Sequence, residues 1–149
     1  MTPERDGATE KSIAALIANA TLSADNTPAA VDLRGFKKAT VELHVGVGGI
    51  TFTGTNKIEF VLTHSDDDST YTNVAAADII KDSLAPTTIT NGIVRALTAA
   101  HAAATVQKIG YIGGKRYLKL LADFSGTHGA GTPIAASVIR EGAESEGSA

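Results

Sequence analysis

Histidine is the residue type here best suited to metal binding or proton transfer, and the chain has four. His44, His64, His101 and His128 lie far apart in the sequence, with no HExxH motif and no pair three or four residues apart. We expect His44 and His64 on neighbouring strands, where they could meet across a sheet, although half-exposed sheet histidines are the more common arrangement. The spacing therefore predicts no metal site.

An acidic run at residues 65–69, SDDDS, carries the hard oxygen atoms that calcium prefers. Asp66, Asp67 and Asp68 are the candidates for metal ligands in this run. It lacks the ligand spacing, the central glycine and the bidentate glutamate of an EF-hand loop. A solvated turn, in which aspartate bonds its own backbone, is the favoured interpretation.

The remaining polar motifs do not combine into a catalytic site. The glycine-rich stretch at 46–54 is not followed by GK[ST], and the serines occur in neither a GxSxG nor an SxxK motif. Lys115 and Arg116 form a positive spot that could pair with a partner's carboxylate, although such charged turns commonly keep a sheet soluble. We therefore predict a protein that is not an enzyme and needs no cofactor.

Composition limits the class of protein further. The 149 residues fit one domain, and the absence of cysteine excludes disulfides and thiolate metal sites. A net charge of −3 with scattered lysine and arginine predicts no direct nucleic-acid binding. The N-terminus is charged and no apolar run is long enough to span a bilayer, so we expect neither an export signal nor a membrane anchor. Few aromatic residues predict a thin aliphatic core that gains stability by association.

Short strands must position the candidate polar residues named above, because apolar side chains alternate at period two through most of the chain. The clearest prediction is a hairpin over residues 106–124, in which Gly113, Gly114 and Lys115 form the turn between two antiparallel strands. Residues 93–104 could instead form an alanine-rich helix, but we favour a strand to Leu97 followed by a loop. Residues 75–83 are expected to make one or two helical turns. The other predicted strands are 31–33, 41–47, 57–65, 71–74, 89–97 and 134–138.

The pattern predicts a mainly β fold, an antiparallel, jelly-roll-like β-sandwich over residues 28–140. Residues 1–27 are predicted to be an N-terminal arm. Its segment 12–23 fits a short helix and an extended edge segment equally well, because Ala and Leu favour helix while the neighbouring sequence is strand-like. Residues 141–149, EGAESEGSA, are predicted to be a disordered acidic tail.

Three phrases of the sequence carry a resemblance that covers roughly residues 28–139: VDLRGF, SDDDSTY and GYIGGKRYLK. The chain resembles a family of small virion proteins encoded beside the major capsid protein of tailed phages. The family signature GYxGxKRYxK is matched here by Gly110, Tyr111, Gly113, Lys115, Arg116, Tyr117 and Lys119. The acidic turn in those relatives is usually SDDGSTY, so Asp68 stands here where they have a glycine.

The resemblance implies a structural role as a cement or decoration protein, made and assembled in the bacterial host cytoplasm and bound to the outer surface of the head. The expected partners are the major capsid protein and the chain itself, with a trimer favoured by local threefold sites. Contacts are expected from the arm and from the positive spot; the candidate residues are Arg5, Ile13, Leu16, Ile17, Lys115 and Arg116.

Two alternatives remain open at this level. One is a tail or neck component, because tail proteins also use small β-sandwiches that form oligomers. The other is a glycan-binding module, because SDDDSTY and KRYLKL are similar to phrases of discoidin-like jelly rolls. Sugar-binding platforms generally use exposed aromatic rings, and this chain has no tryptophan and only three tyrosines.

Overall fold

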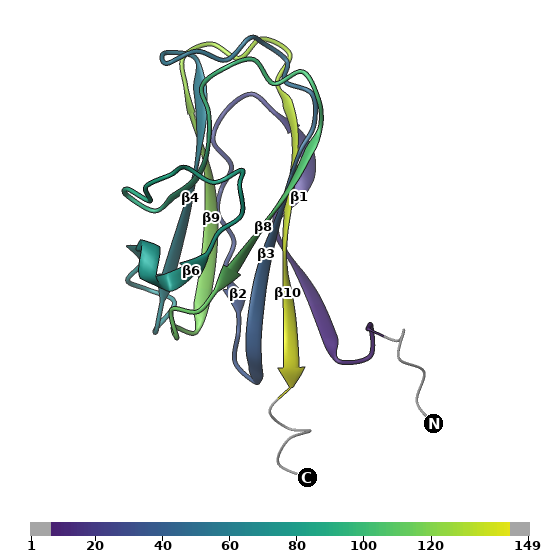
Figure 1. Cartoon of the computed structure of the whole chain (residues 1–149), viewed down its shortest axis with the longest axis vertical. Coiled ribbons are helices and arrows are strands. Elements are labelled where there is room, and N and C mark those ends of the chain that lie inside the picture. The colour runs from purple at the N-terminus through teal and green to yellow at the C-terminus, as the bar shows by residue number, and fades with distance from the viewer. Residues whose placement is uncertain (1–6, 144–149) are drawn as a thin grey trace.

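Two five-stranded antiparallel sheets pack face to face in the computed structural model, which describes residues 7–143 (Figure 1). The first sheet has the order β1 (Lys11–Leu22), β10 (Thr132–Ala143), β3 (Phe36–Val45), β8 (Thr105–Tyr111) and β6 (Ile79–Ile80). The second has the order β2 (Val31–Asp32), β9 (Tyr117–Ser125), β4 (Lys57–Ser65) and β5 (Thr72–Asn73), and β7 (Ile93–Leu97) also pairs with β4. The predicted β-sandwich is confirmed.

Successive strands nearly always lie in opposite sheets. From β1 to β10 the chain crosses between the sheets at every step except β4 to β5. The predicted hairpin over residues 106–124 is therefore wrong: β8 pairs with β3 and β6, whereas β9 pairs with β2 and β4. The period-two pattern identified both strands correctly, but the glycine turn between them leads from one sheet to the other instead of reversing within one.

The core is built from the alternating side chains of the central strands. Val41, Leu43 and Val45 of β3 are fully buried, and so are Ile58, Phe60 and Leu62 of β4 in the facing sheet. The alternate side chains of each strand point outward, as expected for an antiparallel sheet with one solvent-exposed face. The aliphatic core predicted from composition thus lies between the two sheets.

The N-terminal segment belongs to the sandwich. Of the two options for residues 12–23, the extended edge segment is correct and the helix is wrong, because β1 pairs with β10 along the edge of the first sheet. Leu16 and Ile17 are both buried although they are adjacent, and the register shifts between Ala15 and Ile17, as a β-bulge requires. The bulge interrupts the alternation of buried and exposed residues that marks a strand. Residues 11–22 of the predicted arm are a strand of the first sheet, whereas residues 1–6 lie outside the described chain.

The other boundaries were predicted less accurately. Strand β10 continues to Ala143, so the first residues of the predicted disordered tail, 141–143, pair with β3, while residues 144–149 lie outside the described chain. Residues 93–97 form a strand, as favoured. The helical turns expected after residue 74 reduce to one 3₁₀ turn, η1 (Ala76–Asp78), followed directly by β6. No helix within residues 7–143 is long and apolar enough to cross a membrane.

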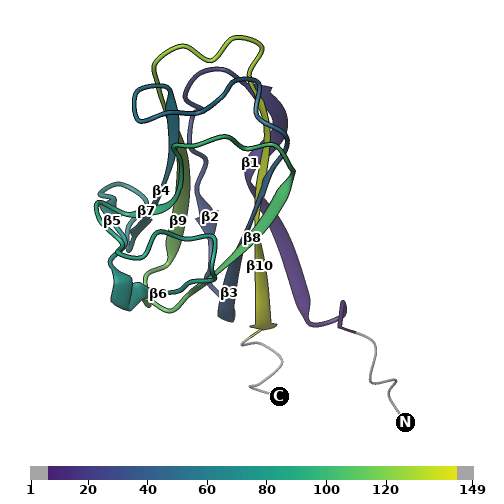
Figure 2. The ribbon, with the colours of Figure 1, turned by 45° about the horizontal axis from the view of Figure 1, so that its top comes forward.

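The two ends of the sandwich are filled differently. At one end the loop after β3 inserts Phe52, which is 2% exposed and packs near His128, while His128 makes an edge contact with Phe124. The start of β1 and the end of β10 lie together at the opposite end, as both views show (Figures 1 and 2). That opposite end contains a cleft.

Candidate functional site

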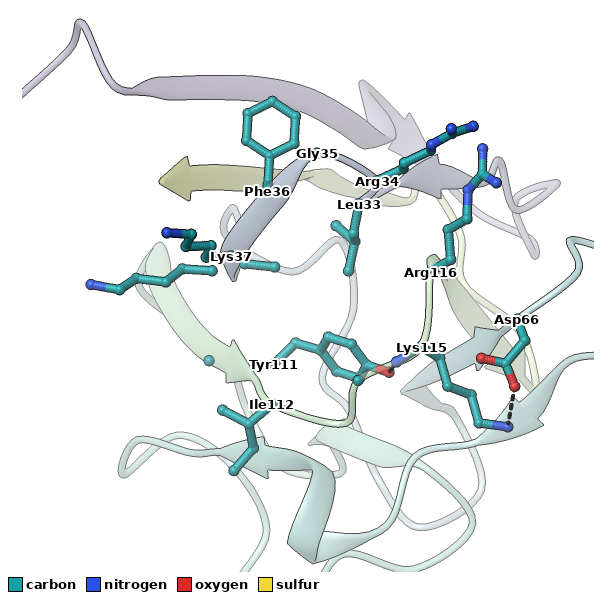
Figure 3. Close-up of a pocket in the computed structure, with 14 residues that line it drawn as sticks. Leu33, Arg34, Gly35, Phe36, Lys37, Asp66, Tyr111, Ile112, Lys115 and Arg116 are labelled. Carbon is teal, nitrogen blue, oxygen red and sulfur yellow. Dashed lines mark hydrogen bonds and ion pairs between the residues drawn. The ribbon is translucent and has the colours of Figure 1, made fainter. Parts of the chain in front are cut away.

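The cleft has a volume of about 620 Å³ and opens where β3 begins and β8 ends (Figure 3). Three segments far apart in the sequence form its walls. One is the turn from β2 into β3, residues 33–39; another is the connection from β8 to β9, residues 110–116 without Gly113; the third contributes Asp66, which follows β4. Because β2, β4 and β9 belong to one sheet and β3 and β8 to the other, the cleft lies between the layers.

Positive charge dominates the cleft. Its lining includes five cationic side chains, Arg34, Lys37, Lys38, Lys115 and Arg116, against the single carboxylate of Asp66. Lys115 Nζ lies 3.7 Å from that carboxylate, a pair that is largely exposed and therefore weak. Within residues 7–143, the charged groups of Arg34, Lys37 and Lys38 have neither a hydrogen bond nor an ion pair. A chain with a net charge of −3 thus gathers unpaired cations at one end.

Arg116 is held in place by a bidentate ion pair. Its Nε and Nη2 atoms each donate to a carboxylate oxygen of Asp32 at 2.8 Å. The bonds from Arg116 hold the pKa of Asp32 at about 2, well below its usual value. Because Asp32 is in β2 and also accepts a bond from the backbone N–H of Arg34, the pair fixes both walls of the cleft relative to each other. Figure 3 shows the guanidinium groups of Arg34 and Arg116 on the same side of the cleft.

The floor of the cleft is a buried hydrogen-bonded cluster. The Tyr111 hydroxyl lies 2.7 Å from Nδ1 of His64 and accepts a 3.0 Å bond from the backbone N–H of Lys115. Burial lowers the pKa of His64, and Asp78, 4.0 Å from its Nε2, acts in the opposite direction. Burial also raises the pKa of Tyr111. Both rings therefore stay neutral near pH 7 and join β4 of one sheet to β8 of the other.

Apolar surface adjoins the charges. Ile112 is 61% exposed on the rim of the cleft, although the backbone beneath it is fixed by a 2.7 Å bond from its N–H to the carbonyl of Asp78. Phe36 lies on the facing wall with the guanidinium of Arg140 4.8 Å from its ring centroid. A ligand that combines negative charge with small apolar groups, such as an acidic peptide segment, matches this surface.

The acidic run is a turn, as favoured. Asp67 accepts bonds from the backbone N–H groups of Ser69 and Thr70 and from the hydroxyl of Ser65, and these bonds lower its pKa to about 2. Asp68 has a φ of +57° and accepts a bond from the Tyr71 hydroxyl, while Asp66 turns toward Lys115. Within residues 7–143, no group of three or more His, Asp or Glu side chains could hold a metal ion.

The structure separates His44 from His64. His44 lies half exposed on β3 with its Nε2 2.6 Å from Glu42, while His64 is buried in the other sheet, so the two do not meet. His101 Nε2 lies 3.4 Å from the Val45 carbonyl, and His128 Nε2 lies 2.8 Å from the Ser125 carbonyl. Each imidazole thus has a local partner in the fold.

The predicted interaction residues lie in different parts of the structure. Lys115 and Arg116 line the cleft, whereas Leu16 and Ile17 belong to the core and cannot contact a partner. Ile13 is 66% exposed on β1, and Arg5 lies outside the described residues.

Sequence reasoning missed three cleft residues, Arg34, Lys37 and Lys38. The available signal was their clustering in LRGFKK immediately before the strand pattern begins.

The fold and the cleft define a β-sandwich with a basic cleft at one end. No protein-family model, curated protein or solved structure matches the chain.

Proposed function

We propose that this chain is a structural protein of a phage virion, a cement or decoration protein that binds the outer surface of the head. In this proposal the basic cleft receives a carboxylate-rich segment of the major capsid protein. The self-association expected from the sequence, with a trimer favoured, is part of the same proposal.

One observation carries the proposal: the three phrases on which the resemblance rests meet in the cleft. VDLRGF supplies Leu33 to Phe36, SDDDSTY supplies Asp66, and GYIGGKRYLK supplies most of the facing wall. These phrases are separated by tens of residues and lie in different strands or turns. Their meeting at one basic surface supports a shared binding role for them.

The chemistry of the cleft suits many weak, repeated contacts. Exposed ion pairs contribute little individually, about 0.2–1 kcal/mol each. A shell presents the same acidic segment many times, and an oligomer that engages several copies gains avidity without any new type of contact. Weak salt-dependent pairing at each cleft is therefore sufficient for stable decoration.

The test is binding to empty shells assembled from the major capsid protein that the resemblance places beside this chain. We expect the purified chain to sediment with expanded shells and to appear as density on their outer surface in electron micrographs. Lys37→Glu reverses an unpaired charge in the cleft and should reduce occupancy several-fold at low salt. Lys108→Glu, on an exposed residue of the outer face of β8, is the matched control and should bind like the wild type.

Three outcomes would contradict the proposal. One is density confined to tails or necks, which would favour the alternative location. Another is normal shell occupancy for Lys37→Glu, which would remove the cleft from the interface. The third, binding to a glycan array in place of shells, would favour the glycan-binding alternative.

A further inference from the structure

The edge of β3 is unpaired where this strand forms a wall of the cleft. Strand β10 pairs with β3 from Phe36 to Val45, whereas β8 pairs with it only from Ala39 to Val45. Within residues 7–143, the segment 36–38 therefore has a neighbouring strand on one side only, and it lines the cleft. The free edge is about 10 Å long.

Strand β8 leaves this edge uncovered because the chain turns away at its end. Tyr111 is the last residue of β8 that pairs with β3. The next residue, Ile112, donates its N–H to the carbonyl of Asp78 at 2.7 Å, which holds the chain away from β3. Figure 3 shows Ile112 across the cleft from Phe36 and Lys37. The position beside β3 that β8 would fill thus opens into the cleft.

The backbone along this edge can accept another strand. Successive residues of a strand direct their N–H and C=O groups to opposite edges, so either Lys37 or Lys38 directs both groups away from β10 and toward the cleft. Within residues 7–143, neither residue's N–H bonds to a turn or loop. An exposed strand edge with free backbone groups is a template for an extended peptide segment.

The side chains along the edge select the charge of such a segment. Lys37 and Lys38 are exposed and adjacent in the strand, so they project from opposite faces of the sheet. Arg34 lies just before them in the same wall. Lysine on an edge strand opposes pairing with a neutral or basic strand, whereas an acidic segment gains ion pairs there.

We propose that an acidic segment in the cleft binds as an added strand, paired backbone to backbone with residues 36–38 of β3. The source of the segment rests on the function proposed above, whereas the way in which it binds does not. Its affinity then has two parts: ion pairs, which salt screens, and backbone hydrogen bonds, which add to the charge and fix the orientation of the segment.

The test uses the full chain and a blocked Glu-Val-Glu-Val-Glu peptide, which combines carboxylates with small apolar groups. Two isomers of the peptide each contain two backbone N-methyl groups, one on both valines and the other on the second and third glutamates. Alternate residues of an extended peptide face opposite edges, so each isomer blocks one edge only. Charge and composition are the same in both isomers, and each therefore serves as the matched control for the other.

We expect one isomer to bind within about threefold of the unmodified peptide and the other to lose about tenfold or more, because it cannot approach β3 or donate to it. All affinities should fall between 0.1 M and 0.5 M salt, while the ratio between the isomers persists. Saturation with the unmodified peptide should also slow hydrogen exchange of the Lys37 or the Lys38 amide about tenfold.

Equal affinity of the three peptides would overturn the inference, because charge alone would then account for binding. An equal loss in both isomers would also overturn it, because pairing through one edge requires one isomer to bind. Discrimination between the isomers by a chain that does not bind shells would refute only the proposed function. Shell binding without such discrimination would refute only the added strand.

Discussion

Tyr111 of β8 and His64 of β4 connect the two sheets of the sandwich directly, hydroxyl to Nδ1, across 2.7 Å. Each residue is at most 6% exposed, so water cannot replace the bond. The same hydroxyl accepts the backbone N–H of Lys115, which places the positive wall of the cleft directly over the bond between the sheets. Stability of the fold and shape of the cleft therefore depend on one phenol.

Removing that hydroxyl should destabilise the protein. Tyr111→Phe leaves a ring nitrogen of His64 and the N–H of Lys115 without their partner, and we expect a loss of about 1–3 kcal/mol in the free energy of unfolding. Tyr71→Phe is the matched control: its hydroxyl bonds the exposed Asp68, so the change should stay within about 0.5 kcal/mol. Urea titrations of both variants measure the difference, and equal losses would argue against the buried cluster.

The same cluster should make stability dependent on pH. Burial lowers the pKa of His64 in the folded state, so the unfolded chain takes up this proton first as pH falls. The contribution of His64 is complete above its unfolded pKa of about 6.5 and is lost as pH falls toward the folded value. Lys115 strengthens the shift, while Asp78 and Asp66 oppose it.

Urea midpoints measured from pH 8 to pH 5 provide the test. His64→Gln should flatten the decline below pH 6.5, whatever it costs in stability at pH 8. An unchanged slope in His64→Gln would assign the decline to other groups.

The bulge in β1 gives a second pair of matched variants. Leu16 is 2% exposed and Ile13, three residues earlier in the same strand, is 66% exposed. Leu16→Ala should therefore cost about 2–4 kcal/mol through lost burial and a residual cavity, whereas Ile13→Ala should change the free energy of unfolding by less than about 0.5 kcal/mol. Similar losses at both positions would mean that Ile13 is covered in solution, for example by a second copy.

Gly49, in the loop after β3, has no room for a side chain because the backbone of Gly131 lies against it. A Cβ at Gly49 would lie 2.0 Å from the Gly131 carbonyl oxygen, whereas a Cβ at Gly54 in the same loop meets nothing within 4 Å. Gly49→Ala should displace the contact with the loop before β10 and cost about 1–3 kcal/mol. Gly54→Ala should be neutral or slightly stabilising, because it restricts the unfolded chain. Thermal unfolding of the two variants compares them directly.

Much of the fold was predictable because period-two burial is a local signal. The pattern in Val41, Leu43 and Val45 identified β3, and the segment from Lys57 to Ser65 was predicted with the bounds that the structure shows. Strand partners were not predictable in this way. Alternation identifies the face that is buried, but it does not distinguish a turn within one sheet from a crossing between two, and the glycines at 113 and 114 permit either.

The cleft escaped prediction for a related reason. Lys115 and Arg116 were predicted as a positive spot because they are adjacent. Arg34, Lys37 and Lys38 were not singled out, because charged residues before a strand are common. Only the crossing topology brings the turn into β3 and the connection after β8 to the same end of the sandwich. Leu16 and Ile17 were misassigned to a binding surface because the bulge that buries both has no signature in the alternation.

The single carboxylate in the cleft gives the sharpest test of its charge. Asp66 is 75% exposed and lies 3.7 Å from Lys115, so it adds little to stability while lowering the positive potential of the cleft. Asp66→Asn should leave the free energy of unfolding within about 0.5 kcal/mol of the wild type. It should also tighten binding of a blocked tetraglutamate peptide by about two- to fivefold at low salt, with convergence at high salt. Glu42→Gln makes the same change in net charge outside the cleft and should leave peptide affinity unchanged; equal gains in both variants would mean that the peptide responds to the overall charge of the protein and not to the cleft.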